Sequence, residues 1–160
     1  MNVAASVAEP ARRRHLWMLA AALVALFAHV DVPAQPRTAD KSLPAADWKA
    51  IRQVIGDQVR ALKADDAAKA FSFASPGIRE QFGTPENFLG MVRTAYGALI
   101  AARYTEFLEG AVIDGNVIQP LRLIAPDNTV QVALYTMEKQ KDGRWRISGC
   151  VLAPSTVQAA

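Results

Sequence analysis

The chain has 160 residues, a formal net charge of +3, two histidines and a single cysteine. This length suits one domain that buries roughly two-thirds of its surface. The small net charge excludes the strongly basic balance of a nucleic-acid-binding domain. The lone cysteine excludes an intramolecular disulfide, so side-chain packing must supply the stability.

Residues 1–34 have the pattern of a secretory signal peptide. Three arginines at positions 12–14 precede an apolar run that begins at Leu16, and small residues lead up to Ala34. A basic stretch, a short apolar stretch and a small-x-small ending are typical of a leader that is cleaved on export. We therefore expect cleavage after Ala34 and a periplasmic or secreted protein. The alternative is an uncleaved inner-membrane anchor formed by residues 16–30, although a full span needs about 20 apolar residues.

Both histidines, His15 and His29, fall in this leader. The rest of the chain lacks the usual general base and the commonest metal ligand. Its residue spacing matches no phosphate loop, nucleophile elbow or zinc site. The sequence therefore predicts no metal, no cofactor and no nucleic-acid partner.

A polar, proline-containing linker is predicted over residues 35–44, followed by a helix over 45–64. Apolar residues recur at helical spacing within this helix, at Trp48, Ile51, Ile55, Val59 and Leu62. The stripe predicts one face of the helix to be buried.

A second helix is predicted over residues 67–74. Asp65 or Asp66 precedes it, and a carboxylate at that position accepts hydrogen bonds from the free N–H groups of the first turn. Ser75, Pro76 and Gly77 break the chain, and residues 78–82 are expected to form one short turn.

A third helix is predicted to begin at Thr84 and to run to about Leu99. Thr84 has the chemistry of a cap and Pro85 that of a first helical residue. Its apolar stripe consists of Phe88, Met91, Val92, Ala95, Tyr96 and Leu99.

From residue 103 onward the composition changes to that of strands. The first two are predicted over 104–113 and 117–124, joined by a turn at Asp114, Gly115 and Asn116. Because Pro120 cannot donate a hydrogen bond to a neighbouring strand, we expect a free edge or a bulge beside it.

The last two strands form a predicted hairpin over residues 130–140 and 144–152, with a three-residue loop that ends in Gly143. This loop predicts the facing pairs Lys139–Trp145, Met137–Ile147, Tyr135–Gly149, Leu134–Cys150 and Val132–Leu152. Alternation then places Tyr135, Met137, Trp145 and Ile147 on one face, which we expect to be the core face.

Helices followed by strands predict an α+β fold. We expect three N-terminal helices packed on one face of a bent four-stranded antiparallel meander, in a cone-like arrangement. The domain is predicted over residues 45–154, with a tail at 155–160.

Several segments together resemble a known bacterial family. They are Leu62-Lys-Ala-Asp-Asp66, Phe82-Gly-Thr-Pro-Glu-Asn-Phe-Leu-Gly-Met-Val92, Tyr135 and Asp142-Gly-Arg-Trp-Arg-Ile-Ser-Gly-Cys150. This order resembles domain-of-unknown-function family 4864, which is similar to the nuclear-transport-factor-two-like (cystatin-like) superfamily. The resemblance implies a cone with an opening at its wide end. It also implies relatives that include isomerases, dehydratases and non-catalytic binding or dimerising modules.

The leading functional hypothesis is an exported non-catalytic module that binds a small apolar ligand or a protein partner. One alternative is a cone-pocket enzyme of the dehydratase or isomerase type, which would use a tyrosine and a carboxylate, either Glu106 or Asp114. Another is a structural envelope protein tethered to the inner membrane.

The register and the third helix also predict which residues form each site. A pocket is expected on the helix side of the sheet, with Met91, Tyr96, Gln131 and Tyr135 as candidate ligand contacts, unless Trp145, Tyr96 and Met91 fill it. On the opposite face, Val132, Leu134, Cys150 and Leu152 are candidate contacts of a homodimer. The alternative cover for that face is the C-terminal tail, residues 153–160.

Overall fold

The computed structural model describes residues 43–154. The predicted leader, most of the linker and the tail lie outside the described residues. Within residues 43–154 the chain forms, in order, α1 (Ala45–Lys63), α2 (Ala67–Ser72), α3 (Pro76–Phe82), α4 (Pro85–Ala95), α5 (Gly97–Ala101), β1 (Tyr104–Phe107), β2 (Ala111–Ile113), β3 (Asn116–Ile124), β4 (Val130–Lys139) and β5 (Trp145–Pro154). No helix in this range is both long and apolar enough to cross a membrane. The predicted α+β class, with helices first and an antiparallel sheet after them, is confirmed.

The helix starts follow from capping chemistry. The side chains of Asp66, Ser75 and Thr84 each accept a hydrogen bond from a backbone N–H in the first turn of α2, α3 and α4. Residues 76–82 form a full short helix with Pro76 in its first turn, where sequence predicted only a turn.

The third predicted helix is also wrong in its extent. It is interrupted at Tyr96, whose φ of −126° and ψ of 27° are not helical, and Gly97 starts the separate helix α5. The described residues therefore contain five helices, and not the three that were expected. The break directs the chain from α4 toward the sheet and places the Tyr96 side chain next to β5.

The sheet has the strand order β1-β3-β4-β5, with β2 pairing to the same strand as β1. The expected single strand over 104–113 is split, because residues 108–110 bulge out opposite Gln119 and Pro120. This confirms the irregularity expected beside Pro120, which has no N–H to donate. The buried Gln119 amide fills the gap, donating to the carbonyls of Leu108 at 2.7 Å and Pro120 at 3.0 Å.

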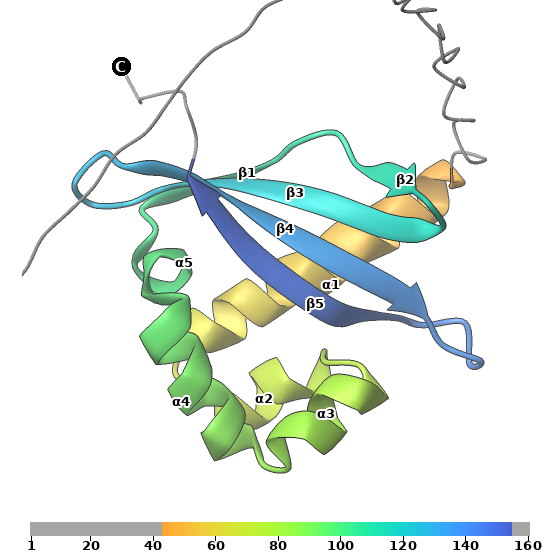
Figure 1. Cartoon of the computed structure of the whole chain (residues 1–160), viewed down its shortest axis with the longest axis horizontal. Helices are drawn as coiled ribbons and strands as arrows, with labels where there is room; N and C mark the ends of the chain where they lie inside the picture. The colour runs from red at the N-terminus through yellow and green to blue at the C-terminus, as the bar shows by residue number, and fades with distance from the viewer. Residues whose placement is uncertain (1–42, 155–160) are drawn as a thin grey trace, which may run out of the picture. The chain divides into compact units, whose positions relative to one another are not determined.

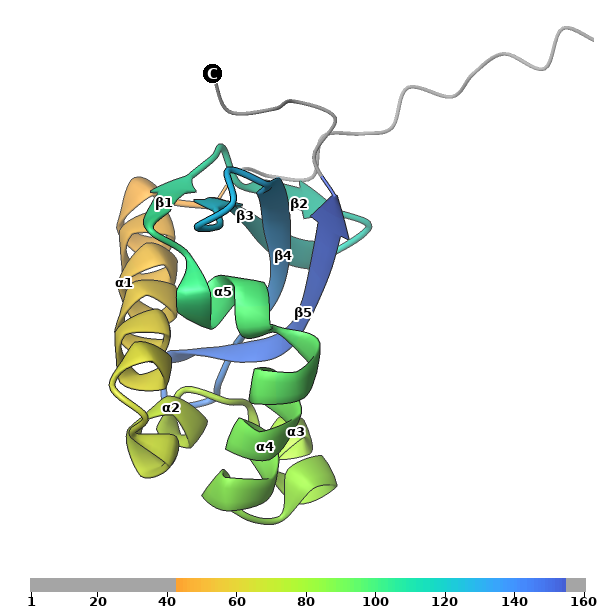
Figure 2. The same cartoon turned by 90° about the vertical axis from the view of Figure 1, so that its left-hand side faces the viewer.

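The helices pack on one side of the sheet. Figure 1 shows α1 running diagonally behind β3, β4 and β5, with α2, α3 and α4 gathered below β5. Figure 2 shows α1 and α5 beside the sheet and α4 beyond its lower end. The core lies between these layers. It includes Ile51 and Ile55 of α1 and Leu123, Ala133 and Tyr135 of the sheet, none of which is more than 1% exposed.

The β4–β5 hairpin keeps the predicted register only near its loop. Lys139 faces Trp145 and Met137 faces Ile147, as predicted. All four residues assigned to the core face are buried, since Tyr135, Met137, Trp145 and Ile147 are 1–5% exposed. The core-face prediction is therefore confirmed.

Beyond Met137 the predicted pairs are wrong, because β5 carries a bulge at Ser148. Thr136 faces Gly149, Tyr135 faces Cys150, Leu134 faces Val151 and Ala133 faces Leu152. One extra residue in one strand exchanges the two faces for everything after it. Cys150 and Leu152 consequently pack toward the core, and Val151 takes the outward position that sequence had given to Cys150.

Candidate ligand-binding cavity

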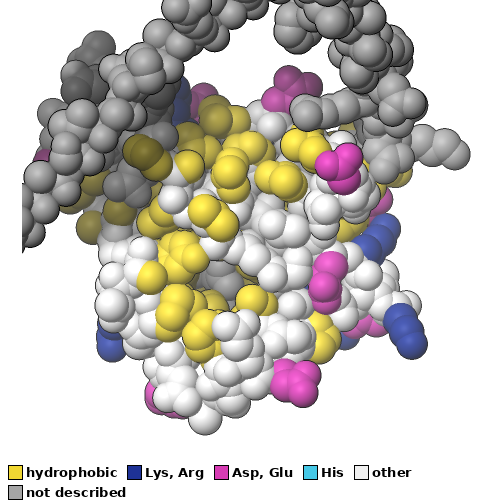
Figure 3. Space-filling model, viewed as in Figure 1, with side chains coloured by type: hydrophobic (Ala, Val, Ile, Leu, Met, Phe, Trp, Pro, Cys, Tyr) yellow, Lys and Arg dark blue, Asp and Glu magenta, His cyan; other side chains and the backbone are white. Residues whose placement is uncertain are grey.

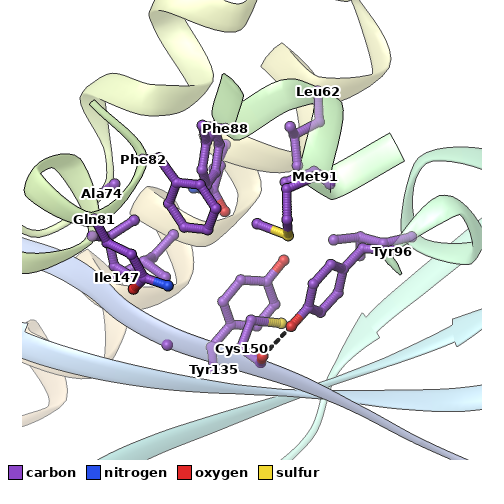
Figure 4. A pocket seen from close by; sticks show the side chains of 15 residues that line it. Leu62, Ala74, Gln81, Phe82, Phe88, Met91, Tyr96, Tyr135, Ile147 and Cys150 are labelled. Carbon is purple, nitrogen blue, oxygen red and sulfur yellow. Dashed lines mark hydrogen bonds between the residues drawn. The ribbon is translucent and has the colours of Figure 1, made fainter. Parts of the chain in front are cut away.

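A cavity of about 380 Å³ lies between the helices and the core face of β4 and β5. Most of its wall is apolar and comes from the helices, including Leu62, Phe82, Phe88, Met91, Val92 and Leu99. Figure 3 shows a hollow ringed by hydrophobic side chains below the sheet, and Figure 4 shows the cavity from close by. Volume and lining are typical of a small-molecule site.

The local backbone explains why this space is not filled. Three residues of β5 line the cavity, Ile147, Gly149 and Cys150, and the last two are small. The facing segment before α3 contributes Ala74, which is also small. Trp145, the largest side chain of β5, is not among the lining residues. Its indole N–H instead donates to Asp47 at 2.9 Å, at the start of α1. Met91 and Tyr96 line the cavity without closing it.

One edge of the cavity is fixed by an added piece of sheet. The N–H of Ile147 donates to the carbonyl of Phe73 at 3.0 Å, and the N–H of Ser75 donates to the carbonyl of Ile147 at 2.8 Å. These two bonds form a parallel bridge between Ala74 and Ile147. The bridge holds the connection between α2 and α3 against β5, beside the Ser148 bulge.

The polar groups of the wall differ in whether they have partners. The Tyr96 hydroxyl donates to the carbonyl of Cys150 at 2.6 Å, and the Gln58 amide donates to the carbonyl of Ala70 at 3.3 Å. Tyr135 is 1% exposed, yet within residues 43–154 no group meets its hydroxyl oxygen with the geometry of a hydrogen bond. Besides burial, interaction with the Cys150 thiol raises the pKa of this hydroxyl, but a thiol is only a weak hydrogen-bond donor and acceptor.

Burial keeps the ionisable groups of the wall neutral. It raises the pKa of Tyr135 well above the usual value, with the nearby Cys150 as the second cause. Burial likewise raises the pKa of Tyr96 and raises the pKa of Cys150 to about 12. The 15 lining residues include no Asp, Glu, Lys, Arg or His. At neutral pH the cavity wall is therefore uncharged.

Three of the four predicted pocket residues meet at this cavity, namely Met91, Tyr96 and Tyr135. Gln131 does not line it, because it lies nearer the other end of β4, opposite Leu123 and Pro154. Sequence reasoning missed Cys150, which it had assigned to the outer face. Gly149 could have signalled the bulge, since an isolated glycine within a strand often marks one.

The carboxylates proposed for the enzyme alternative lie elsewhere. Glu106 forms an ion pair with Arg122 on the neighbouring strand. Asp114 is exposed in the turn between β2 and β3, with a φ of 50°. Neither residue lines the cavity. Across residues 43–154 no group of three or more His, Cys, Asp or Glu side chains could hold a metal ion.

The outer face of the sheet keeps only part of its predicted apolar patch. Leu134 is 37% exposed and Val132 is half-buried, while Val151, opposite Leu134, is 62% exposed. Cys150 and Leu152 are turned inward by the bulge. The outer patch therefore consists of Val132, Leu134 and Val151.

Comparison with known proteins identifies the family. The family model named domain of unknown function (DUF4864) matches residues 44–160, and the chain belongs to this family. No curated protein matches the chain.

Proposed function

We propose that the domain is a non-catalytic module that holds a small apolar ligand in the cavity beside β5. The observation that carries this proposal is an uncharged cavity of about 380 Å³ with an apolar wall. Burial of apolar surface is favourable at roughly 25 cal/mol per Å², so a hydrophobic molecule gains from leaving water for this wall.

The chemistry of the wall favours retention of the ligand over turnover. General acid–base catalysis works best with a group whose pKa lies near the working pH. Burial moves the pKa values of Tyr96, Tyr135 and Cys150 away from neutrality. The carboxylate needed for dehydratase or isomerase chemistry is not among the 15 lining residues. These features support binding as the function of the cavity.

Fluorescence titration with the apolar probe N-phenyl-1-naphthylamine tests the proposal. The wild-type protein should bind the probe saturably. Met91→Trp places a larger side chain in the cavity and should abolish binding, whereas Leu134→Trp, on the outer face, should leave it intact. Circular dichroism establishes that both variants are folded. Absence of saturable binding in the wild type, or equal binding by both variants, would refute a ligand-holding cavity.

We also propose that the domain is a branch of the nuclear-transport-factor-two-like superfamily, with a cone-like sheet. A long first helix, further short helices and then an antiparallel sheet support this placement, as does the cavity between the layers. An experimental structure whose sheet does not curve around the helices would rule it out.

Export is proposed from the first 34 residues, which carry the basic, apolar and small-residue pattern of a leader. The intact mass of protein recovered from the periplasm should match a chain that begins at Gln35. A full-length product in the membrane fraction would instead favour a tether formed by residues 16–30, and with it a structural role in the envelope.

A homodimer is proposed through the patch of Val132, Leu134 and Val151. Two of these side chains are well exposed on neighbouring strands, with exposed fractions of 37% for Leu134 and 62% for Val151, and such apolar groups favour contact with a partner. Sedimentation of the wild type and of Leu134→Asp tests this. The wild type should be a dimer and the variant a folded monomer. If both are folded monomers, the dimer proposal is wrong.

A further inference from the structure

The hydroxyl of Tyr135 is a hydrogen-bond donor without an acceptor. Tyr135 is 1% exposed, and its hydroxyl has no partner among the residues described. A buried polar group left unpaired carries a desolvation penalty. The other tyrosine of the wall differs, because the Tyr96 hydroxyl is already bonded to the carbonyl of Cys150.

This hydroxyl faces the cavity. Figure 4 shows the Tyr135 ring rising from β4 with its oxygen directed toward Met91, into the space that Met91 and Tyr96 border. Tyr135 is held in place on β4 by its backbone pairing to Gln119 on one side and to Cys150 on the other. The oxygen itself is buried beside Met91, so an occupant that shifts this flexible side chain meets a fixed donor within an apolar wall.

The charge of the wall limits which acceptor can fill this role. The 15 described lining residues include no Lys or Arg, so a carboxylate or phosphate would lose its hydration without gaining a counter-ion from them. Such burial of an unpaired charge is strongly unfavourable. A neutral oxygen acceptor gains the Tyr135 hydrogen bond without that cost.

We infer that the cavity selects a neutral, apolar molecule with an oxygen acceptor, such as a ketone, ester or ether, and that the Tyr135 hydroxyl donates to this oxygen. The inference rests on the proposed function, because it requires that the cavity holds a ligand. It assigns to Tyr135 the specificity for the acceptor and to the helix side chains the affinity for the apolar part.

Three probes of the same ring system test it: 2-acetylnaphthalene, 2-ethylnaphthalene and 2-naphthoate, which present a ketone, a hydrocarbon and a carboxylate. Dissociation constants are measured by titration at neutral pH with protein produced from the full sequence. Tyr135→Phe should lower the affinity for the ketone relative to the hydrocarbon by about threefold to tenfold, the value of one net hydrogen bond. The ratio of the two dissociation constants is compared between the wild type and the variant, and this comparison cancels the different hydrophobicities of the two probes.

Two further tyrosine variants act as controls. Tyr96→Phe should change binding of ketone and hydrocarbon by the same factor, because its hydroxyl is committed to Cys150. Tyr104→Phe should change neither, because Tyr104 is 50% exposed and does not line the cavity. Unfolding curves of each variant separate loss of binding from loss of fold.

The outcomes distinguish this inference from the proposed function. Binding of no probe refutes both. If the hydrocarbon and the ketone bind but Tyr135→Phe leaves their ratio unchanged, the ligand-holding cavity stands and the role of Tyr135 is wrong. Binding of the carboxylate as tightly as the ketone in the wild type overturns the neutral class of ligand, and this readout does not require any variant to fold.

Discussion

The region around Trp145 and the region around Tyr135 lie on the same two strands but differ in whether their polar groups have hydrogen-bond partners. In the first, the Trp145 indole N–H and the Lys139 ammonium both donate to Asp47, each at 2.9 Å, and the ammonium lies 5.6 Å from the Trp145 ring centroid. On β3, the buried Gln119 amide likewise has partners, because it bonds two carbonyls and also accepts from Arg52 at 3.2 Å. In the second region the Tyr135 hydroxyl has no hydrogen-bond partner within the described part of the chain.

This difference separates a closed region from an open one. Satisfied buried groups hold the start of α1 against the sheet and leave no acceptor or donor for another molecule. An unpaired donor beside an apolar cavity instead leaves an interaction to be completed by a ligand. Mutations in the closed region should therefore change stability, whereas mutations at Tyr135 should change binding.

Trp145→Ala should give the largest effect. Trp145 is 5% exposed and its ring packs in the core. Truncation of a buried aromatic to alanine typically costs about 3–5 kcal/mol in the free energy of unfolding. Urea denaturation measures this cost. The control Tyr104→Ala removes a side chain that is 50% exposed and should lie within about 0.5 kcal/mol of the wild type. Equal effects of the two changes would contradict the view that Trp145 stabilises a closed, packed region.

Gln119→Met should give the next largest loss in the free energy of unfolding. It keeps an unbranched side chain of similar length but removes the amide that bonds the carbonyls of Leu108 and Pro120. Leaving a buried carbonyl unpaired costs about 1–3 kcal/mol. The matched control is Gln131→Met on β4, where the amide is partly exposed, and it should be close to neutral. A neutral Gln119→Met would show that the break between β1 and β2 does not depend on this amide.

Gly110→Ala tests the packing of α1 against the same break. A Cβ at Gly110 would lie 2.3 Å from an atom of the Trp48 ring, so the indole must move. Overpacking of this kind costs about 1–3 kcal/mol. Gly90→Ala within α4 meets nothing within 4 Å and should stabilise the helix by up to about 1 kcal/mol. Thermal unfolding of the two variants should therefore shift in opposite directions.

Asp47 gives the closed region a dependence on pH. Its hydrogen bond from Lys139, and then that from Trp145, lower the pKa of the carboxyl. The stabilisation is therefore present above the pKa of the unfolded chain and is lost as the pH falls through the folded value, below about pH 4. Between about pH 6 and about pH 3, the wild type should lose more stability than Asp47→Asn, measured by urea denaturation at each pH. Lys139→Met should also weaken the dependence of stability on pH. If both variants keep the wild-type slope of unfolding free energy against pH, the Asp47 carboxylate does not cause this dependence.

Burial patterns and helix caps were the part of the fold that sequence could predict. The alternation of apolar residues placed Tyr135, Met137, Trp145 and Ile147 on the core face, because that pattern is set by burial alone. The caps at Asp66 and Thr84 followed from side-chain chemistry close in sequence. These features depend on local residues or on a simple period.

The open region depends on events that a single sequence signals weakly. The bulge at Ser148 exchanges the faces of Cys150 and Val151, and a bulge is selected by twist and packing against α2 and α3. The break at Tyr96 is similar, since apolar spacing continued through it to Leu99. Met91, Tyr96 and Tyr135 still meet at the cavity, because the apolar stripe and the core face of β4 were predicted correctly although the helix is not continuous. Gln131 was not at the cavity, although alternation along β4 was followed correctly, because the cavity lies toward the other end of the strand.

Tyr135→Phe should give the smallest effect on stability and the clearest contrast with the closed region. The change removes one oxygen that has no hydrogen-bond partner among residues 43–154, so no strong hydrogen bond is lost in the ligand-free protein. Removing an unsatisfied buried hydroxyl is expected to be neutral or stabilising by up to about 1 kcal/mol. Tyr96→Phe removes a hydroxyl that donates to Cys150 at 2.6 Å and should instead destabilise by about 1 kcal/mol. Each variant loses one tyrosine hydroxyl from the wall of the same cavity. The two changes should nevertheless move the free energy of unfolding in opposite directions. Urea denaturation of ligand-free protein measures both. Destabilisation by Tyr135→Phe equal to that of Tyr96→Phe would mean that the Tyr135 hydroxyl has a partner within the fold, and the contrast between the closed and open regions would no longer hold.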